Sequence, residues 1–257
     1  IDKNEPWWED LTPTYPNNLL DWQGNKFIEQ NKSTAAHPNS RFTVSITQCP
    51  TLSKEFFNPK GVPISAIILG ARRSTLIPLV YESLDWQLGV FLGAMMGSET
   101  TSAASHKVGV VRRDPMAMLP FCGYNMGDYF GHWLKILKKL KNPPKIFFVN
   151  WFRKDQYGKF LWPGFGENIR VLKWIIERIQ NKIGAEETQI GYIPKFGDFE
   201  LSGLNISKEQ FNNLFSIDKK SWSDELEEAE AFFENFGSKM PPQLKEEFNI
   251  LEKKING

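Results

Sequence analysis

An aromatic segment between residues 150 and 168 carries the side chains best suited to holding a flat ligand. Glycine and proline interrupt it, and five rings crowd it: Trp151, Phe152, Phe160, Trp162 and Phe165. Exposed rings stack on heterocycles, and each stacked base contributes about 1–3 kcal/mol in single-strand binders. The amide of Asn168, at the end of the segment, can donate to and accept from the edge of a base. The segment favours a purine slot, and the alternative from the residues alone is an aromatic minicore beneath a loop.

Two arginine-bearing segments have the chemistry to bind anions. Arg72-Arg73 follows an apolar run that ends at Gly70, and α/β sheets place their ligand crevices beyond the ends of such strands. In the block 37–42, Asn39 and Arg41 lie two residues apart, so on an extended segment they point to the same side. The planar guanidinium suits carboxylates and phosphates. The alternatives are solvated arginines at 72–73 and, at Arg41, an ion pair with a carboxylate.

The segment 98–107 is small and polar, with no apolar stripe to face a core. It contains these polar residues: Ser98, Glu99, Thr100, Thr101, His106 and Lys107. Such a segment is typical of either an exposed loop or a mobile lid over a site. Its composition alone favours the exposed loop.

Apolar runs and helical periodicity predict the elements that position these groups. Strands are expected at 62–69 and 145–151, a short helix at 79–86, and amphipathic helices at 127–141 and 169–179. The C-terminal third has capping and periodic patterns of further helices. We therefore expect an α/β fold with a mixed sheet flanked by helices and a helical C-terminal tail.

The proposed division of the chain separates an irregular linker and packing segment from one domain. Residues 1–36 are rich in Pro, Asn and Trp and show little periodicity. Residues 37–257 hold the periodic elements and all the candidate site residues. The chain begins with Ile1, which leads us to expect a fragment or a processed chain.

Composition excludes several classes of protein. The 257 residues include 31 basic and 30 acidic side chains, and a net charge of +1 argues against a nucleic-acid binder driven by bulk charge. No apolar run of about 18 residues predicts a membrane span. Two cysteines exclude a disulfide scaffold, and no cluster of His and Cys predicts a metal site. The sequence also lacks the G-x-x-x-x-G-K-[ST] phosphate loop.

Taken together, the blocks resemble those of the GTP-dependent phosphoenolpyruvate carboxykinases. The similarity runs from about His37 to the C-terminus and is dense in H-P-N-S-R-F (37–42), R-R (72–73), S-E-T-T (98–101), F-V-N-W-F-R-K-D (148–155) and F-L-W-P-G-F-G-E-N (160–168). The last two blocks are long and rich in tryptophan, a rare residue. The chain is identified as similar to the C-terminal, guanine-nucleotide-binding part of that family.

The resemblance implies an activity and its ligands. The family converts oxaloacetate and GTP into phosphoenolpyruvate, GDP and CO2 in gluconeogenesis, a decarboxylating phosphoryl transfer that uses Mn or Mg. It implies that Asn39 and Arg41 bind the substrate, that Arg41 and Arg72 are catalytic, and that Arg72 binds nucleotide phosphates. It further implies a monomer in the cytoplasm, with the mitochondrial matrix as the alternative, and no nucleic-acid or membrane partner.

The resemblance also assigns the aromatic segment and the polar segment. Phe152, Phe160 and Phe165 enclose the guanine with Trp151 beside them, and Asn168 reads the base edge. The segment 98–107 is the lid that excludes water from the site. The family's phosphate loop, metal ligands and oxaloacetate-binding arginine are expected N-terminal to this segment, so we expect these 257 residues to be inactive alone.

Departures from the family pattern keep other functions open. Ala71 stands where a glycine is usual, Ser105 replaces an acidic residue, Val108 replaces a glycine and Leu119 replaces an arginine. A non-catalytic paralogue that binds GTP or is purely structural is the main alternative. A carbohydrate- or RNA-binding module that uses exposed tryptophans and the lysines of 135–141 is the third.

Overall fold

The computed structural model describes residues 14–28, 34–37, 43–101 and 108–257. The chain divides into two compact units, one made of residues 1–62 and 101–108 and the other of residues 63–100 and 109–257. The expected boundary at residue 37 stays a prediction. No helix in the described part of the chain is long and apolar enough to cross a membrane.

The described part of the first unit consists of turns and short helical segments. Its 3-10 helices are Ile46–Gln48 and Lys54–Phe57. Tyr15 stacks on Phe27 with ring centroids 4.9 Å apart, and an isolated bridge joins Leu20 to Lys26.

The second unit is built on a five-stranded mixed sheet in the order β1-β5-β2-β7-β6. Its strands are β1 (Ala66–Gly70), β2 (Val80–Glu82), β5 (Lys145–Val149), β6 (Glu186–Glu187) and β7 (Tyr192–Ile193). β1 and β5 are parallel, with Ala66 opposite Lys145, and the other pairings are antiparallel. A separate antiparallel pair is formed by β3 (Gly97–Glu99), which contains the start of the polar segment 98–107, and β4 (Val111–Arg113), which follows that segment in the sequence. The predicted mixed sheet and both predicted strands are confirmed.

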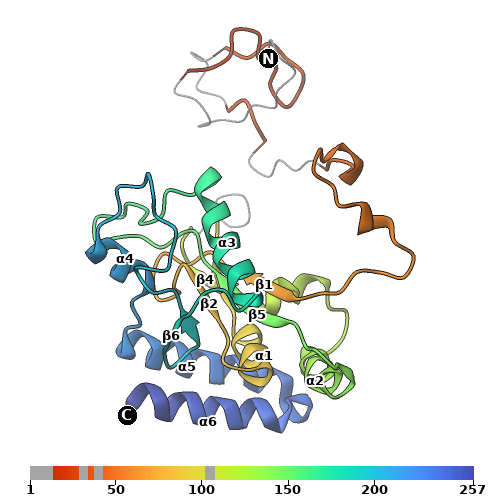
Figure 1. Ribbon diagram of the computed structural model, residues 1–257, viewed down its shortest axis with the longest axis vertical. Coiled ribbons are helices and arrows are strands. Elements are labelled where there is room, and N and C mark those ends of the chain that lie inside the picture. The colour runs from red at the N-terminus through yellow and green to blue at the C-terminus, as the bar shows by residue number, and fades with distance from the viewer. Residues whose placement is uncertain (1–13, 29–33, 38–42, 102–107) are drawn as a thin grey trace. The chain divides into compact units, whose positions relative to one another are not determined.

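Helices cover both faces of this sheet because consecutive residues of β5 point to opposite sides. On one face, α1 (Trp86–Ala94) lies so close that a Cβ on Gly89 would meet the side chain of Ile146 at 2.7 Å. On the other face, Trp174 of α3 (Asn168–Ile179) packs edge-on against Phe147 at 6.1 Å. Figure 1 shows α1 and α3 on opposite sides of the strands.

The remaining helices complete the predicted helical C-terminal part. They are α2 (Met126–Ile136), α4 (Lys208–Phe215), α5 (Lys219–Phe233) and α6 (Pro242–Asn256). Figure 1 shows α5 and α6 running side by side, and both α2 and α6 contact α1. The predicted capping box is present at α4, where Ser207 and Gln210 each bond the other's backbone N–H.

The helix predicted at 79–86 is wrong. Val80 and Tyr81 belong to β2, where both are buried and paired with β5. β-branched and aromatic residues buried in a sheet favour this strand over a helix. The helix begins only after Asp85, whose side chain accepts a hydrogen bond from the backbone N–H of Leu88.

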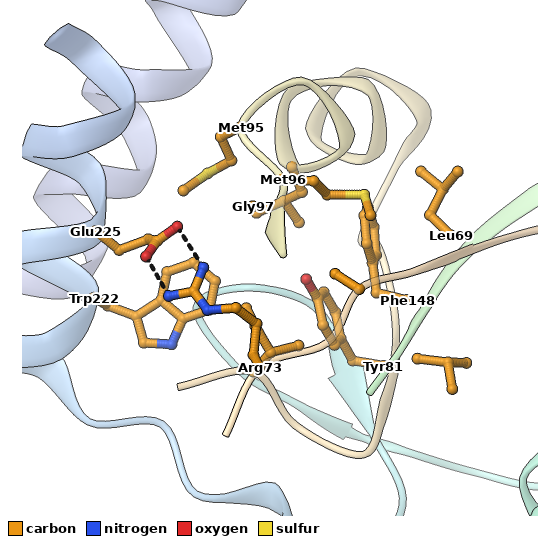
Figure 2. Close-up of a pocket in the computed structure, with 13 residues that line it drawn as sticks. Leu69, Arg73, Tyr81, Met95, Met96, Gly97, Phe148, Trp222 and Glu225 are labelled. Atoms are coloured by element: carbon orange, nitrogen blue, oxygen red, sulfur yellow. Dashed lines mark hydrogen bonds and ion pairs between the residues drawn. The ribbon is translucent and has the colours of Figure 1, made fainter. Parts of the chain in front are cut away.

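A buried ion pair ties the end of β1 to α5. Arg73 donates to Glu225 from both terminal nitrogens, at 3.0 and 2.6 Å, and Arg113 of β4 donates to the same carboxylate at 2.5 Å. Figure 2 shows Arg73 and Glu225 meeting beside Trp222 at the edge of a small cavity. The second carboxylate partner of Arg113, Glu228, lies at the surface. The geometry makes Glu225 the anchor of two strand ends.

Glu225→Ala should lower the free energy of unfolding by about 3–5 kcal/mol, because it leaves two largely buried guanidinium groups without their shared counter-charge. Glu228→Ala removes a carboxylate that is 67% exposed, and its effect should stay below about 1 kcal/mol. Urea titration of both variants measures the difference. Equal losses would contradict the anchoring role of Glu225.

Candidate functional site

The carboxyl ends of β1 and β5 meet at one edge of the sheet because the two strands are parallel. Arg72 follows β1, and Trp151 and Phe152 follow β5. The segments that the sequence singled out at residues 72–73 and 150–168 are therefore neighbours. This edge is where α/β sheets bind ligands.

The fully buried side chain of Asn150 holds these two strand ends together. Its Oδ1 accepts hydrogen bonds from the backbone N–H groups of Arg73 and Phe152, both at 3.2 Å. Its Nδ2 donates to the carbonyl oxygens of Arg73 at 2.8 Å and Ile77 at 2.9 Å. One amide thus fixes the backbone on both sides of the site, and sequence reasoning missed it. The available signal was a lone asparagine at the end of the apolar run 145–149.

The backbone of Arg72 is held by β3. Its N–H donates to the Ser98 hydroxyl at 3.0 Å, and its carbonyl accepts from the Glu99 N–H at 2.8 Å. The Glu99 carboxylate in turn accepts from the backbone N–H and the hydroxyl of Ser74, both at 2.6 Å. The start of the polar segment 98–107 is therefore bonded directly to the loop that carries Arg72.

The guanidinium of Arg72 has no carboxylate partner in the described part of the chain. Its Cζ lies 4.8 Å from the centre of the Phe152 ring, and Nη1 is 3.5 Å from the Glu99 carbonyl oxygen. Arg73, by contrast, is 6% exposed and paired with Glu225. Of the two adjacent arginines, only Arg72 keeps a charge that is available to an anion.

The aromatic residues separate into buried and exposed groups. Trp162 is 2% exposed and packs edge-on against Phe199, whereas Phe160 is 52% exposed and Phe165 is 76% exposed. The rings of Phe152 and Phe160 lie 6.2 Å apart, and the Lys154 ammonium sits 4.9 Å above the Phe160 ring.

A short hairpin presents Phe160. A bridge pairs Lys154 with Phe160, and the Asp155 carboxylate accepts backbone hydrogen bonds from Tyr157 and Lys159 at 2.9 Å. Arg153 anchors the hairpin through Ser216, donating to its carbonyl oxygen at 3.0 Å and its hydroxyl at 2.6 Å. Burial lowers the pKa of Arg153 to about 10, so the side chain remains charged at neutral pH.

Phe165 has a strained backbone, with a φ of 50° directly after Gly164 at 75°. A left-handed conformation costs a side-chain-bearing residue about 1–2 kcal/mol. The exposed ring gains little burial to offset this strain. Strain of this kind concentrates at functional sites, which supports a binding role for Phe165.

Asn168 begins α3, and its Oδ1 accepts a hydrogen bond from the indole Nε1 of Trp162 at 2.9 Å. Trp151 is partly buried against the core.

Ser98, Glu99 and Thr100 form the beginning of the polar segment, and the Thr100 N–H donates to the Val110 carbonyl oxygen at 2.9 Å.

Several predicted site residues lie outside the described part of the chain. They are Asn39, Arg41, His106 and Lys107, whereas Thr101 is described. Within the described ranges, no group of three or more His, Cys, Asp or Glu side chains could hold a metal ion. The described residues therefore do not fit the divalent metal that the resemblance implies.

Comparison with known proteins gives consistent matches over nearly the whole chain. Residues 1–254 match the family model of the phosphoenolpyruvate carboxykinase C-terminal P-loop domain. The chain is 51% identical over 251 residues to a phosphoenolpyruvate carboxykinase [GTP] of Thermoplasma volcanium, and the match covers 98% of this chain. It is 49% identical over 249 residues to the proteins of the same name from Anaeromyxobacter sp. (strain K) and Anaeromyxobacter dehalogenans (strain 2CP-1), over 97% of this chain. The chain spans 42% of the length of each of these relatives.

Asn150→Ala should lower the free energy of unfolding by about 3 kcal/mol, because it leaves buried backbone donors and acceptors without partners. Asn249→Ala, at an exposed position of α6, is the matched control and should change stability by less than about 0.5 kcal/mol. Denaturant titration of both variants checks this. A loss at position 150 no larger than that at position 249 would show that the amide does not hold the two strand ends.

Proposed function

This chain belongs to the GTP-dependent phosphoenolpyruvate carboxykinase family, and we propose that it supplies the guanine slot, the substrate arginines and the lid of such an enzyme. The complete enzyme would convert oxaloacetate and GTP into phosphoenolpyruvate, GDP and CO2, a step of gluconeogenesis. The observation that carries this proposal is that Arg72, which has no carboxylate partner among the described residues, lies on the Phe152 ring, next to the exposed ring of Phe160.

The exposed rings of Phe160 and Phe165 would bind the two faces of the guanine, with Phe152 and Trp151 forming the wall behind. Stacking between a base and an aromatic ring is strong enough to account for much of the affinity for the base. The half-exposed Phe160 ring and the strained backbone of Phe165 support this assignment. Asn168 would read the edge of the base.

Arg72 would neutralise negative charge on the nucleotide phosphates and on the group in transfer. Phosphoryl transfer is catalysed mainly by positioning and by electrostatic stabilisation, and an arginine commonly provides the latter. Phe152 contacts both the guanidinium of Arg72 and the ring of Phe160. A nucleotide with its base at Phe160 would therefore direct its phosphates towards Arg72.

Asn39 and Arg41 would contact the substrate and the phosphoryl group, as the resemblance implies. The segment 98–107 would cover the site, and its hydrogen bonds to the Arg72 loop support a role next to the phosphates. Water excluded from a reactive enolate cannot quench it by protonation.

The phosphate loop and the metal site are proposed to lie in other parts of the complete enzyme. The 257 residues contain no G-x-x-x-x-G-K-[ST] sequence, although the matching family is named for a P-loop domain. Mn or Mg would supply charge neutralisation when bound. We further propose a cytoplasmic monomer, and we expect the isolated 257 residues to be inactive.

A non-catalytic GTP-binding or structural paralogue is the second candidate. Leu119, in place of the family's arginine, is 36% exposed on a 3-10 turn, where it supplies no charge. Phosphoenolpyruvate formation by the complete protein would support the enzyme, whereas GTP binding without turnover would support the paralogue.

Phe160→Ala should raise the KM for GTP about tenfold or more and leave kcat within about twofold, because the ring contributes to binding in the ground state and the transition state alike. Phe56→Ala, which removes an equally exposed ring from the first unit, should change neither constant. Steady-state kinetics of the complete enzyme measures both. An unchanged KM at position 160 would remove this ring from the slot.

Arg72→Ala should instead lower kcat by about 10³-fold, since the positive charge acts most strongly on the transition state. Arg112→Ala, which removes an exposed arginine from β4, should retain nearly full turnover. Single-turnover phosphoryl transfer separates this effect from product release. A change confined to KM would assign Arg72 to binding alone.

A further inference from the structure

The indole N–H of Trp162 forms a hydrogen bond that stacking of a base in the slot does not itself require. The side chain is among the largest fully buried ones, and its ring packs against Phe199. Its Nε1 nevertheless donates to Asn168 Oδ1 at 2.9 Å across the turn that carries Phe165. The other buried tryptophans differ: Nε1 of Trp86 donates to the Trp133 carbonyl oxygen at 2.9 Å, whereas Nε1 of Trp174 and of Trp222 has no hydrogen-bond partner among the described residues. Burial of a tryptophan in this core therefore does not by itself require a bond from its N–H, and the bond of Trp162 needs an explanation of its own.

This bond determines which way round the Asn168 amide sits. An indole nitrogen can only donate, so the atom of Asn168 that faces Trp162 must be the carbonyl oxygen. The amide nitrogen then points away from Trp162. The structure gives that nitrogen no partner among the described residues, and the side chain is only partly buried. Two N–H donors are left for a ligand.

We propose that Trp162 is a positioning residue that turns the NH2 group of Asn168 towards the base, so that the slot selects purine nucleotides with an oxygen at position 6. A 6-oxo group accepts a hydrogen bond from this NH2. A 6-amino group would place donor against donor and leave both without partners. This inference rests on the proposed function, because it requires the base to lie in the slot beside Asn168.

The direct test is Trp162→Phe in the complete enzyme, with GTP and ATP as competing phosphoryl donors. The variant keeps an aromatic ring in the core and removes only the indole N–H and part of the ring. The ratio of kcat/KM for GTP to that for ATP should fall about tenfold, through a higher KM for GTP and with kcat nearly unchanged.

Trp174→Phe is the matched control. Trp174 lies on α3 with Asn168 and is as deeply buried as Trp162, but its Nε1 makes no hydrogen bond to any described residue. Any general loosening of the core should appear equally in both variants. Only a specific effect on the amide lowers the GTP-to-ATP ratio at position 162 alone.

Asn168→Asp tests the same idea without touching the core. The aspartate still accepts the Trp162 bond, and a negative charge is favourable in the first turn of a helix, so the variant should fold even if Trp162→Phe does not. It has no NH2 group, so the preference for GTP over ATP should be lost. In the wild-type enzyme ITP, which has the 6-oxo group without the 2-amino group, should be used far better than ATP.

The outcomes separate this inference from the proposed function. If the wild-type enzyme does not prefer GTP, the guanine slot itself is wrong. If the wild type prefers GTP but Trp162→Phe matches Trp174→Phe, or if Asn168→Asp keeps the preference, the slot stands and the role of Trp162 is overturned. Rejection of ITP as strong as that of ATP would also overturn it.

Discussion

The candidate site depends on a single buried amide. The side-chain amide of Asn150 makes four hydrogen bonds, all to backbone groups of the loops that follow β1 and β5. Parallel strands bring these loops to one edge of the sheet, but they do not fix the course of either loop. A buried amide with four good hydrogen bonds does, because any movement would leave polar groups unpaired away from water. Arg72 and Phe152 owe their proximity to this constraint.

The two adjacent arginines have different roles: one stabilises the fold and the other belongs to the candidate site. Neighbouring residues on an extended segment point in opposite directions. Arg73 points inwards, where Glu225 compensates its charge. Tyr81 is buried in the same region, and its burial raises the pKa of its hydroxyl group. Arg72 points outwards onto the Phe152 ring. The buried arginine thus holds the backbone from which the available one acts.

The sequence predicted the mixed sheet, both main strands and the aromatic segment, since these depend on local patterns of apolar residues. It could not separate Trp162, which packs in the core, from Phe160 and Phe165, which are exposed, because burial depends on distant partners such as Phe199. It also misassigned 79–86, where pairing with β5 decides the conformation. Asn150 was missed for the same reason, since two of its three partner residues, Ile77 and Arg73, lie 73 and 77 residues away in sequence. The assignments of Asn39 and Arg41 remain predictions.

The central claim is that the aromatic edge beyond β1 and β5 is a guanine-nucleotide site, and a crystal structure of the complete enzyme with GDP tests it most directly. We predict that the base lies between the rings of Phe160 and Phe165, with the Asn168 amide nitrogen within about 3.2 Å of the 6-oxo group. The phosphates should extend towards the guanidinium of Arg72. A base bound elsewhere, with these rings still exposed to solvent, would contradict the account.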